Sequence, residues 1–174
     1  MIPFEKLVAT GNDFLLVDAR RPRRRALTAR WPQVARALCD RRDGMGADGL
    51  LVLERSAVAE VRMRIFNSDG SEAEMCGNGA RCVAWYATRV SANGRTPRSL
   101  MKRLTIQTKA GRLAARVEGQ RVVIQMTDPS VIRLSRSVTL DGHRIRFSSV
   151  NTGVPHAVVP VRRLDEVDVV QLGR

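Results

Sequence analysis

The chain of 174 residues is 44% apolar and carries three cysteines, a composition that excludes a largely disordered protein and a disulfide framework. No apolar run approaches the roughly 20 residues that span a bilayer, and no secretory signal opens the chain, so we expect a globular cytoplasmic protein without a membrane segment. The formal charge of +13 favours a nucleic-acid binder, but arginines scattered along the chain and seven aromatic residues outside any RNA-binding pattern favour a solvated arginine-rich surface instead.

The N-terminal segment predicts a β-hairpin. Apolar runs at residues 2–8 and 14–18 flank the turn-forming sequence ATGND, which places Asn12 at the tip of the connection. The basic run RRPRRR follows at residues 20–25. It is the main local cluster of positive charge, and we expect it to be part of the solvated surface.

A helix and a buried strand come next. Thr28 can cap the helix, and four apolar residues recur at helical spacing: Trp31, Val34, Ala35 and Leu38. The glycine- and aspartate-rich segment 41–49 is then irregular, and it leads into a buried strand at residues 50–53.

Residues 61–66 alternate between apolar and arginine side chains, which predicts a strand that ends at the turn NSDG. A second helix is expected to begin near Gly79. Its apolar residues lie three and four positions apart and are Ala80, Val83, Ala84 and Ala87. Residues 91–99 are expected to fray from its far end.

Three strands joined by tight turns are predicted at residues 104–108, 113–117 and 122–126. The sequence TDPS then breaks the pattern, so we divide the chain into a first domain, residues 1–126, and the beginning of a second, residues 127–174. Another hairpin follows, with strands at 138–140 and 144–150, and the last stretch is typical of the start of a helix.

Cys76 stands between a turn and the small residues GNG, where a helix can open. A helix N-terminus binds carboxylate or phosphate and can lower the pKa of a thiol. Glycine at position 77 lets backbone N–H groups approach a ligand, and the amides of Asn67 and Asn78 can both donate and accept hydrogen bonds. The alternative is a small core residue, but GNG suits no strand or helix interior, which favours a site for chemistry at Cys76.

The other cysteines and the histidines offer weaker alternatives. The spacing from Cys76 to Cys82 fits no common zinc site, so we expect no metal and assign Cys39 and Cys82 to the apolar faces of their helices. His156 could activate Cys76 as in a thiol hydrolase, or it could have a structural role. His143 lies between basic residues on a strand and is expected at the surface.

The run FNSDGSEAEMCGNGARC resembles the signature of the diaminopimelate epimerases, bacterial amino-acid epimerases that work without pyridoxal phosphate. The segments FEKLVATGNDFLLVD, DGMGADGLLVLE and NTGVPHAVV resemble further parts of the same family, in the same order. The resemblance implies an α+β fold of mostly antiparallel strands wrapped around a central helix. It also implies no cofactor, a small-molecule substrate (diaminopimelate), no membrane partner, and a homodimer as one arrangement.

The resemblance further implies a two-base mechanism. A cysteine thiolate takes the α-proton of LL-diaminopimelate from one face, and a second cysteine returns a proton on the other to give the meso form, for lysine and peptidoglycan synthesis. Cys76 matches the first cysteine. Asn12, Asn67, Gly77 and Asn78 match substrate-binding positions, and His156 matches a histidine that supports catalysis.

The chain departs from the family pattern at Gly49, where glutamine is common, and at Val154, where asparagine is common and Asn151 could substitute. No second cysteine motif follows, so we expect the N-terminal portion of an epimerase, with little activity and marginal stability by itself. The alternatives are a related cofactor-independent racemase or isomerase and an inactive arginine-rich fragment that binds nucleic acid.

Overall fold

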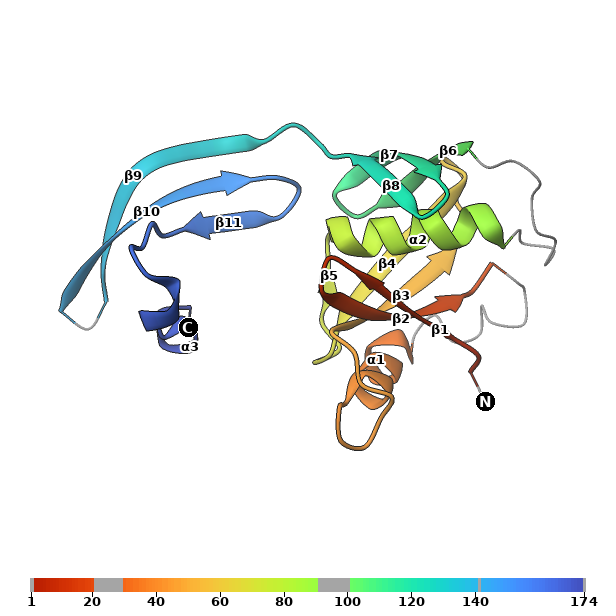
Figure 1. Cartoon of the computed structure of the whole chain (residues 1–174), viewed down its shortest axis with the longest axis horizontal. Coiled ribbons are helices and arrows are strands. Elements are labelled where there is room, and N and C mark those ends of the chain that lie inside the picture. The colour runs from red at the N-terminus through yellow and green to blue at the C-terminus, as the bar shows by residue number, and fades with distance from the viewer. Residues whose placement is uncertain (1, 21–29, 91–100, 141, 174) are drawn as a thin grey trace. The chain divides into compact units, whose positions relative to one another are not determined.

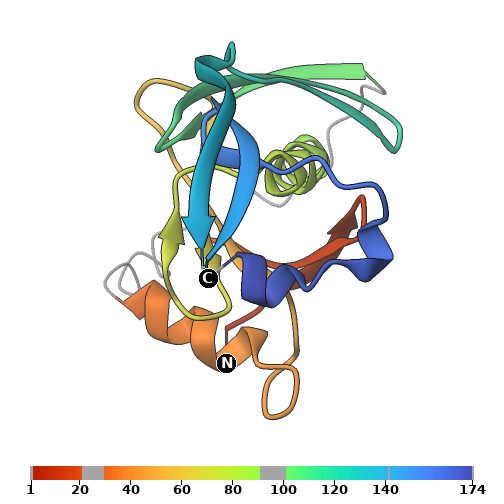
Figure 2. The ribbon, with the colours of Figure 1, turned by 90° about the vertical axis from the view of Figure 1, so that its left-hand side faces the viewer.

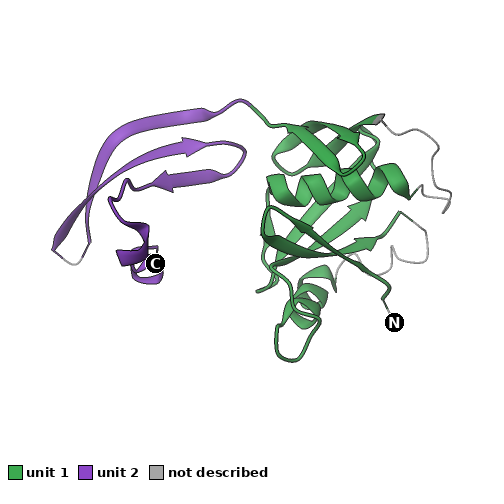
Figure 3. Cartoon of the chain, in the orientation of Figure 1, with its two compact units in different colours: residues 1–127 green, residues 128–174 purple. Residues whose placement is uncertain are grey.

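The computed structural model describes residues 2–20, 30–90, 101–140 and 142–173, and it forms two compact units, residues 1–127 and 128–174 (Figure 3). The division lies one residue from the domain boundary expected from the sequence. In the described part of the chain, no helix combines the length and the apolar character that crossing a bilayer requires.

The first unit is an eight-stranded sheet curled around a helix (Figure 1). The strands run in the order β1-β2-β3-β4-β6-β7-β8, and β5 pairs with β4. Their bounds are β1 Glu5–Ala9, β2 Asn12–Asp18, β3 Gly49–Glu54, β4 Val61–Asn67, β5 Glu72–Ala73, β6 Met101–Thr108, β7 Gly111–Glu118 and β8 Arg121–Gln125. Pairing is antiparallel except between β2 and β3 and between β4 and β6.

Helix α2 (Gly77–Arg89) occupies the inside of the curl. It contacts β1, β2, β3, β4, β6, β7 and β8, and Figure 2 shows the light-green helix nearly end-on between the two halves of the sheet. The expected fold of mostly antiparallel strands around a central helix is therefore confirmed.

Helix α1 (Trp31–Cys39) packs on β3 and β4. Leu50 and Val52 of β3 belong to the same buried cluster as Trp31 of α1, while Leu51 lies against Gly79 of α2. Because β3 is covered on both faces, its sequence is a continuous apolar run instead of an alternating one. The expected Thr28 cap lies outside the described residues, and the residue that precedes the helix is Arg30.

The N-terminal hairpin was expected, but Asn12 does not lie at its tip. The turn consists of Thr10 and Gly11, with φ angles of 50° and 86°. Positive φ at both central residues is the geometry of a tight two-residue hairpin turn whose twist matches that of the flanking strands. Asn12 is therefore the first residue of β2, paired with Ala9, and its side chain is held on a strand.

The expectation that the basic run is solvated is wrong at Arg20. Its side chain is buried, and its guanidinium donates to both carboxylate oxygens of Asp18, at 2.9 and 2.7 Å, and to the carbonyl of Val90 at 2.6 Å. A buried guanidinium needs such acceptors, because desolvation without them is costly. Residues 21–25 of the run lie outside the described residues.

The other strand predictions of the first unit are confirmed. In β4, Val61, Met63 and Ile65 are buried, and the intervening arginines are partly exposed. Strands β6, β7 and β8 form the expected antiparallel meander. The segment expected to fray after α2 lies outside the described residues.

The second unit is a three-stranded antiparallel sheet with the order β11-β10-β9, followed by short helical segments. Its elements are β9 Ser130–Leu140, β10 His143–Asn151, β11 Pro155–Val158, the 3-10 helix η2 Leu164–Glu166 and the helix α3 Val169–Leu172. The expected hairpin is thus present with longer strands, and the expected terminal helix is limited to two short turns.

Candidate active site

Cys76 is the residue that caps helix α2. Its backbone is extended, with φ of −145°, and its Sγ accepts a hydrogen bond from the N–H of Gly79 at 3.4 Å. This contact is that of an N-cap side chain with the third helical residue. The helix therefore begins at Gly77, two residues before Gly79, because the cysteine itself satisfies one N–H of the first turn.

The three cysteines have different surroundings. Cys39 and Cys82 are buried as expected, and burial raises the pKa of each of their thiols to about 11. Both therefore stay protonated near neutral pH. Cys76 is partly exposed at the start of α2. Among these cysteines, it is the one that is not buried.

Asn12 and Asn78 are brought together beside Cys76. Nδ2 of Asn78 donates to Oδ1 of Asn12 at 2.6 Å, across 66 residues of sequence. Asn78 is the second residue of α2, and Asn12 is the first of β2. Arg81, one turn further along the helix, donates to Oδ1 of Asn78. The amide pair thus joins the hairpin to the helix at the point where Cys76 begins it.

The side-chain nitrogen of Asn12 is bound by a cluster of charged residues. Nδ2 of Asn12 donates to Asp48 at 3.0 Å, and the guanidinium of Arg41 donates at 2.8 Å to Asp13 and to Asp48. Lys6 lies 3.2 Å from Asp13. The Arg41 hydrogen bond is the largest influence holding the pKa of Asp13 well below its usual range, and the bond from Asn12 does most to lower the pKa of Asp48. Both carboxyl groups are therefore ionised near neutral pH.

Sequence reasoning missed the residues that support this pair: Asp13, Arg41, Asp48 and Arg81. Asp13 follows Asn12 directly, and Asp48 lies in the glycine-rich loop before β3. Polar residues in a loop that leads to a buried strand are a usable signal, since loops carry binding residues on a rigid scaffold. Which of them meet depends on the parallel pairing of β2 with β3, which local patterns do not reveal.

Asn67 and Gly49 lie at the same end of the sheet. Gly49 pairs with Phe14 of β2 and with Asn67 of β4. The side chain of Asn67 donates to Ser71 at 2.9 Å, so in the described contacts it is held by its own turn and not by Asn12 or Asn78. A Cβ at Gly49 would lie 2.8 Å from the Phe66 carbonyl oxygen, which explains glycine at this position.

His156 belongs to the second unit. It is exposed on β11, and its Nδ1 lies 2.7 Å from the Val154 carbonyl oxygen and 3.4 Å from the Thr152 hydroxyl. Asn151 accepts from the N–H of Gly153 at 2.8 Å. These contacts are local to one loop, and the pairing of His156 with Cys76 stays a prediction. His143, the first residue of β10, is exposed as expected.

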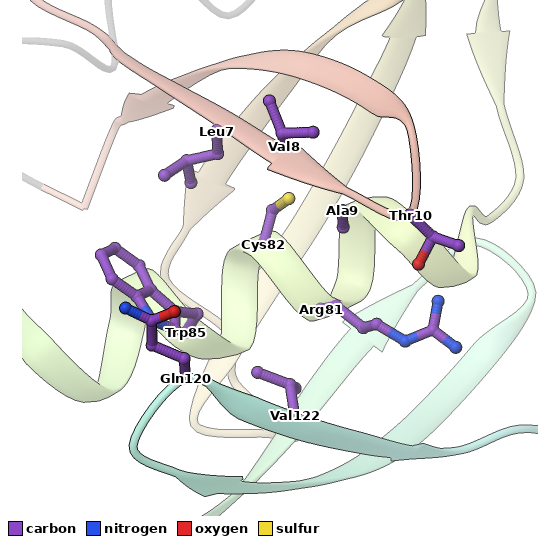
Figure 4. Close-up of a pocket in the computed structure, with 9 residues that line it drawn as sticks. All are labelled: Leu7, Val8, Ala9, Thr10, Arg81, Cys82, Trp85, Gln120 and Val122. Atoms are coloured by element: carbon purple, nitrogen blue, oxygen red, sulfur yellow. The ribbon is translucent and has the colours of Figure 1, made fainter.

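A hollow of about 520 Å³ lies along α2 between the two edge strands of the curled sheet. Figure 4 shows residues of β1 on one side of it, β8 on the other, and Arg81, Cys82 and Trp85 of α2 along its floor. Arg81 belongs both to this lining and to the network around Asn78, whereas Cys76 does not line the hollow. Within the part of the chain that the structure describes, no group of three histidine, cysteine, aspartate or glutamate side chains could hold a metal ion.

Comparison with known proteins identifies the family. The family model described as diaminopimelate epimerase matches residues 4–132. Curated relatives include the diaminopimelate epimerases of Archaeoglobus fulgidus, 39% identical over 99% of this chain, and of Caldanaerobacter subterraneus, 35% identical over 98%. These matches cover 63% and 64% of the relatives, so the chain spans somewhat less than two thirds of their length.

Solved structures show the same fold at low sequence identity. A probable proline racemase from Agrobacterium radiobacter matches with a TM-score of 0.70 at 17% identity, covering 98% of this chain and 53% of that one. A hydroxyproline epimerase from Agrobacterium vitis matches with a TM-score of 0.68, also at 17% identity, covering 98% and 52%. With a family model that matches most of its residues and relatives of more than one third identity, the chain belongs to the diaminopimelate epimerase family.

Proposed function

We propose that this chain supplies one wall of a cofactor-independent epimerase site, which interconverts LL- and meso-diaminopimelate with Cys76 as one of two acid–base groups. The observation that carries the proposal is the position of Cys76 as the N-cap of α2, partly exposed and beside the Asn12–Asn78 pair. Membership of the family, whose named relatives are diaminopimelate epimerases, supports the choice of substrate.

The start of α2 suits an amino-acid carboxylate. The N–H of Gly79 is used by Cys76 Sγ, and that of Ala80 by the Cys76 carbonyl. The N–H groups of Gly77 and Asn78 have no acceptor among the described residues and remain for a ligand, at the positive end of the helix dipole. Negative charge that develops on the substrate when its α-proton leaves is stabilised by the same groups.

In the proposed step, the thiolate of Cys76 takes the α-hydrogen as a proton, so the S–H bond forms as the Cα–H bond breaks. The electron pair stays on the substrate, next to its carboxylate. A second acid then gives a proton to the opposite face and inverts the centre. Cys39 is buried in the core, and Cys82 is buried on α2, the same helix that Cys76 caps, so neither is assigned this role. We propose a second acid outside these cysteines, and His156 as a supporting residue.

Asn12, Asn67, Gly77 and Asn78 are proposed to bind the substrate. The reaction needs a reduced thiol, which fits a cytoplasmic location. A homodimer is compatible with the proposal, and the site as proposed does not require one.

The test is α-hydrogen exchange in deuterated water, followed by NMR, with the epimerase that contains this chain and LL-diaminopimelate. Wild type should incorporate deuterium and form the meso isomer, and Cys76→Ala should lose both by at least about 1,000-fold, since it lacks the base. Cys39→Ala, which removes a buried thiol, is the matched control and should retain both. If exchange and epimerisation survive in Cys76→Ala, Cys76 is not the base. If the enzyme turns over another amino acid in preference to diaminopimelate, the proposed substrate is wrong.

A further inference from the structure

Four side chains at the start of α2 form one continuous line of hydrogen bonds. Arg81 donates to Oδ1 of Asn78, Nδ2 of Asn78 donates to Oδ1 of Asn12, and Nδ2 of Asn12 donates to Oδ2 of Asp48. Every bond points the same way along the line. It begins at a cation and ends at a carboxylate, and it joins elements 36 and 66 residues apart in sequence.

The charged ends determine which way each amide faces. A guanidinium can only donate, so it selects the oxygen of Asn78, and an ionised carboxylate can only accept, so it selects the nitrogen of Asn12. If the two amides flipped together, donor would face donor at Arg81 and acceptor would face acceptor at Asp48. If one amide flipped alone, the same conflict would arise between the two asparagines as well.

This orientation leaves specific atoms for a ligand. Each asparagine NH2 group carries two hydrogens, and the line uses one of each. The second N–H of Asn12 and the second N–H of Asn78 are therefore outside the line. Together with the N–H groups of Gly77 and Asn78, they form a set of donors at a helix N-terminus, which suits a carboxylate.

We propose that Asp48 and Arg81 are positioning residues that lock the amide orientation of the Asn12–Asn78 pair, so that the pair presents N–H donors to the carboxylate of the amino-acid substrate. The assignment of a substrate rests on the proposed function, whereas the locking is a property of the free protein. Neither residue is required to touch the substrate.

A purely structural role is the competing explanation, because Asp48 also accepts from Arg41 and from the N–H of Asp13. Arg81 separates the two explanations. It meets the line at the opposite end, on α2, and its contact with Asn78 is independent of the Asp13–Arg41–Asp48 cluster. Loss of either end should therefore disturb both amides if the line acts as a unit.

The test is NMR of the ¹⁵N-labelled 174-residue chain, following the side-chain NH2 signals of Asn12 and Asn78. In wild type, we expect these protons to exchange with water at least about 10-fold more slowly than those of an exposed asparagine. In Asp48→Asn the Asn78 signals should move, and in Arg81→Gln the Asn12 signals should move, although neither amide touches the substituted residue. Glutamine can donate or accept and so no longer selects one face of the amide, whereas Arg81→Lys keeps a side chain that can only donate and should restore the wild-type signals.

Asp43→Asn is the matched control, since it makes the same charge change in the same loop. Asp43 has no side-chain partner in the described contacts, and both amides should stay unchanged in this variant. Changes confined to the directly contacted amide in Asp48→Asn and Arg81→Gln would overturn the proposal. If Asp48→Asn fails to fold, Arg81→Gln alone decides it.

A kinetic arm then tests the link to substrate in the active epimerase. Asp48→Asn and Arg81→Gln should raise KM for diaminopimelate about 10-fold with a smaller change in kcat, and Arg81→Lys should remain close to wild type. Coupled amide signals in the 174-residue chain, combined with no turnover of diaminopimelate by the protein that contains it, would leave the locking established and refute the proposed function. Unchanged KM in an active enzyme would refute the role toward the carboxylate.

Discussion

Position decides what each cysteine of this chain can do. Cys39 is the last residue of α1 and Cys82 lies within α2, and both side chains are buried. Burial disfavours the charged form of a thiol, which is why the pKa of each is raised to about 11. Cys76 has the same chemistry but caps a helix at a partly exposed position. Of the three cysteines, Cys76 is therefore the one expected to act as a nucleophile or a base.

This difference predicts selective alkylation. Iodoacetamide reacts with the thiolate, and a thiol with a pKa near 11 is ionised to only about one part in a thousand at pH 8. Treatment of the native chain at pH 8, followed by peptide mass spectrometry, should modify Cys76 first and leave Cys39 and Cys82 unmodified until urea is added. The Cys76→Ser variant serves as the control and should take up no label under native conditions. Labelling of Cys82 at a rate equal to that of Cys76 would contradict this account.

At the scale of single elements, the close approach of α2 to the sheet depends on one glycine. A Cβ at Gly79 would lie 2.9 Å from Cδ2 of Leu51, 3.5 Å from Cβ of Cys76 and 3.6 Å from Cδ1 of Ile65. Leu51 is fully buried and has little room to move. Gly77, two residues earlier in the same helix, has only Met126 near its position, at 3.6 Å. The two glycines lie in the same helix, but an added Cβ would be crowded at Gly79 and not at Gly77.

The pair provides a matched test of this packing. Gly79→Ala should destabilise the first unit by about 1–3 kcal/mol, because it overpacks the contact between helix and sheet. Gly77→Ala should change stability by less than about 1 kcal/mol, since its methyl group meets only Met126, at an ordinary contact distance, and alanine favours a helix. Urea unfolding followed by circular dichroism measures both variants. Equal stability of the two would show that α2 does not rest on Leu51 through Gly79.

The elements themselves were largely predictable, because their signals are local. The alternation of Val61, Met63 and Ile65 in β4 and the turn glycines of the β6–β8 meander follow from residues that are neighbours in sequence. The tip position of Asn12 was wrong because the tight turn uses Thr10 and Gly11 alone, and so the strand resumes earlier than a longer loop would allow. Helix α2 begins two residues before Gly79, at the first residue of GNG, because a cysteine acts as its cap.

For the whole molecule, the two units differ in how much apolar surface they bury. The core of the first unit includes fully buried residues from β2, β3 and α2, such as Leu15, Leu50 and Val83. No described residue of the second unit is buried, and Leu134 and Leu164 are each 73% exposed. Buried apolar area is the main favourable term in folding, so the first unit should be the more stable of the two.

Hydrogen exchange should report this difference. Amides of β2 and β3 should exchange only through global unfolding, whereas those of β9, β10 and β11 should exchange through local opening, at least about 100-fold faster. Mass spectrometry of peptic fragments of the 174-residue chain, taken over seconds to hours, measures both sets. Equal protection of β10 and β3 would show that the second unit has a source of stability other than its own burial.

By itself, the sequence determined the family, the order of the elements and the choice of Cys76 as the candidate site, because motifs and periodicity are carried by residues close together in the chain. Only the tertiary structure decided which side chains lie near that cysteine. Asn12 meets Asp48 across 36 residues and Asn78 across 66, through the parallel pairing of β2 with β3 and the packing of α2 inside the curled sheet. Hydrogen bonds and burial depend on distances in space, so amide orientation and the raised pKa values of Cys39 and Cys82 appear only once the chain is folded.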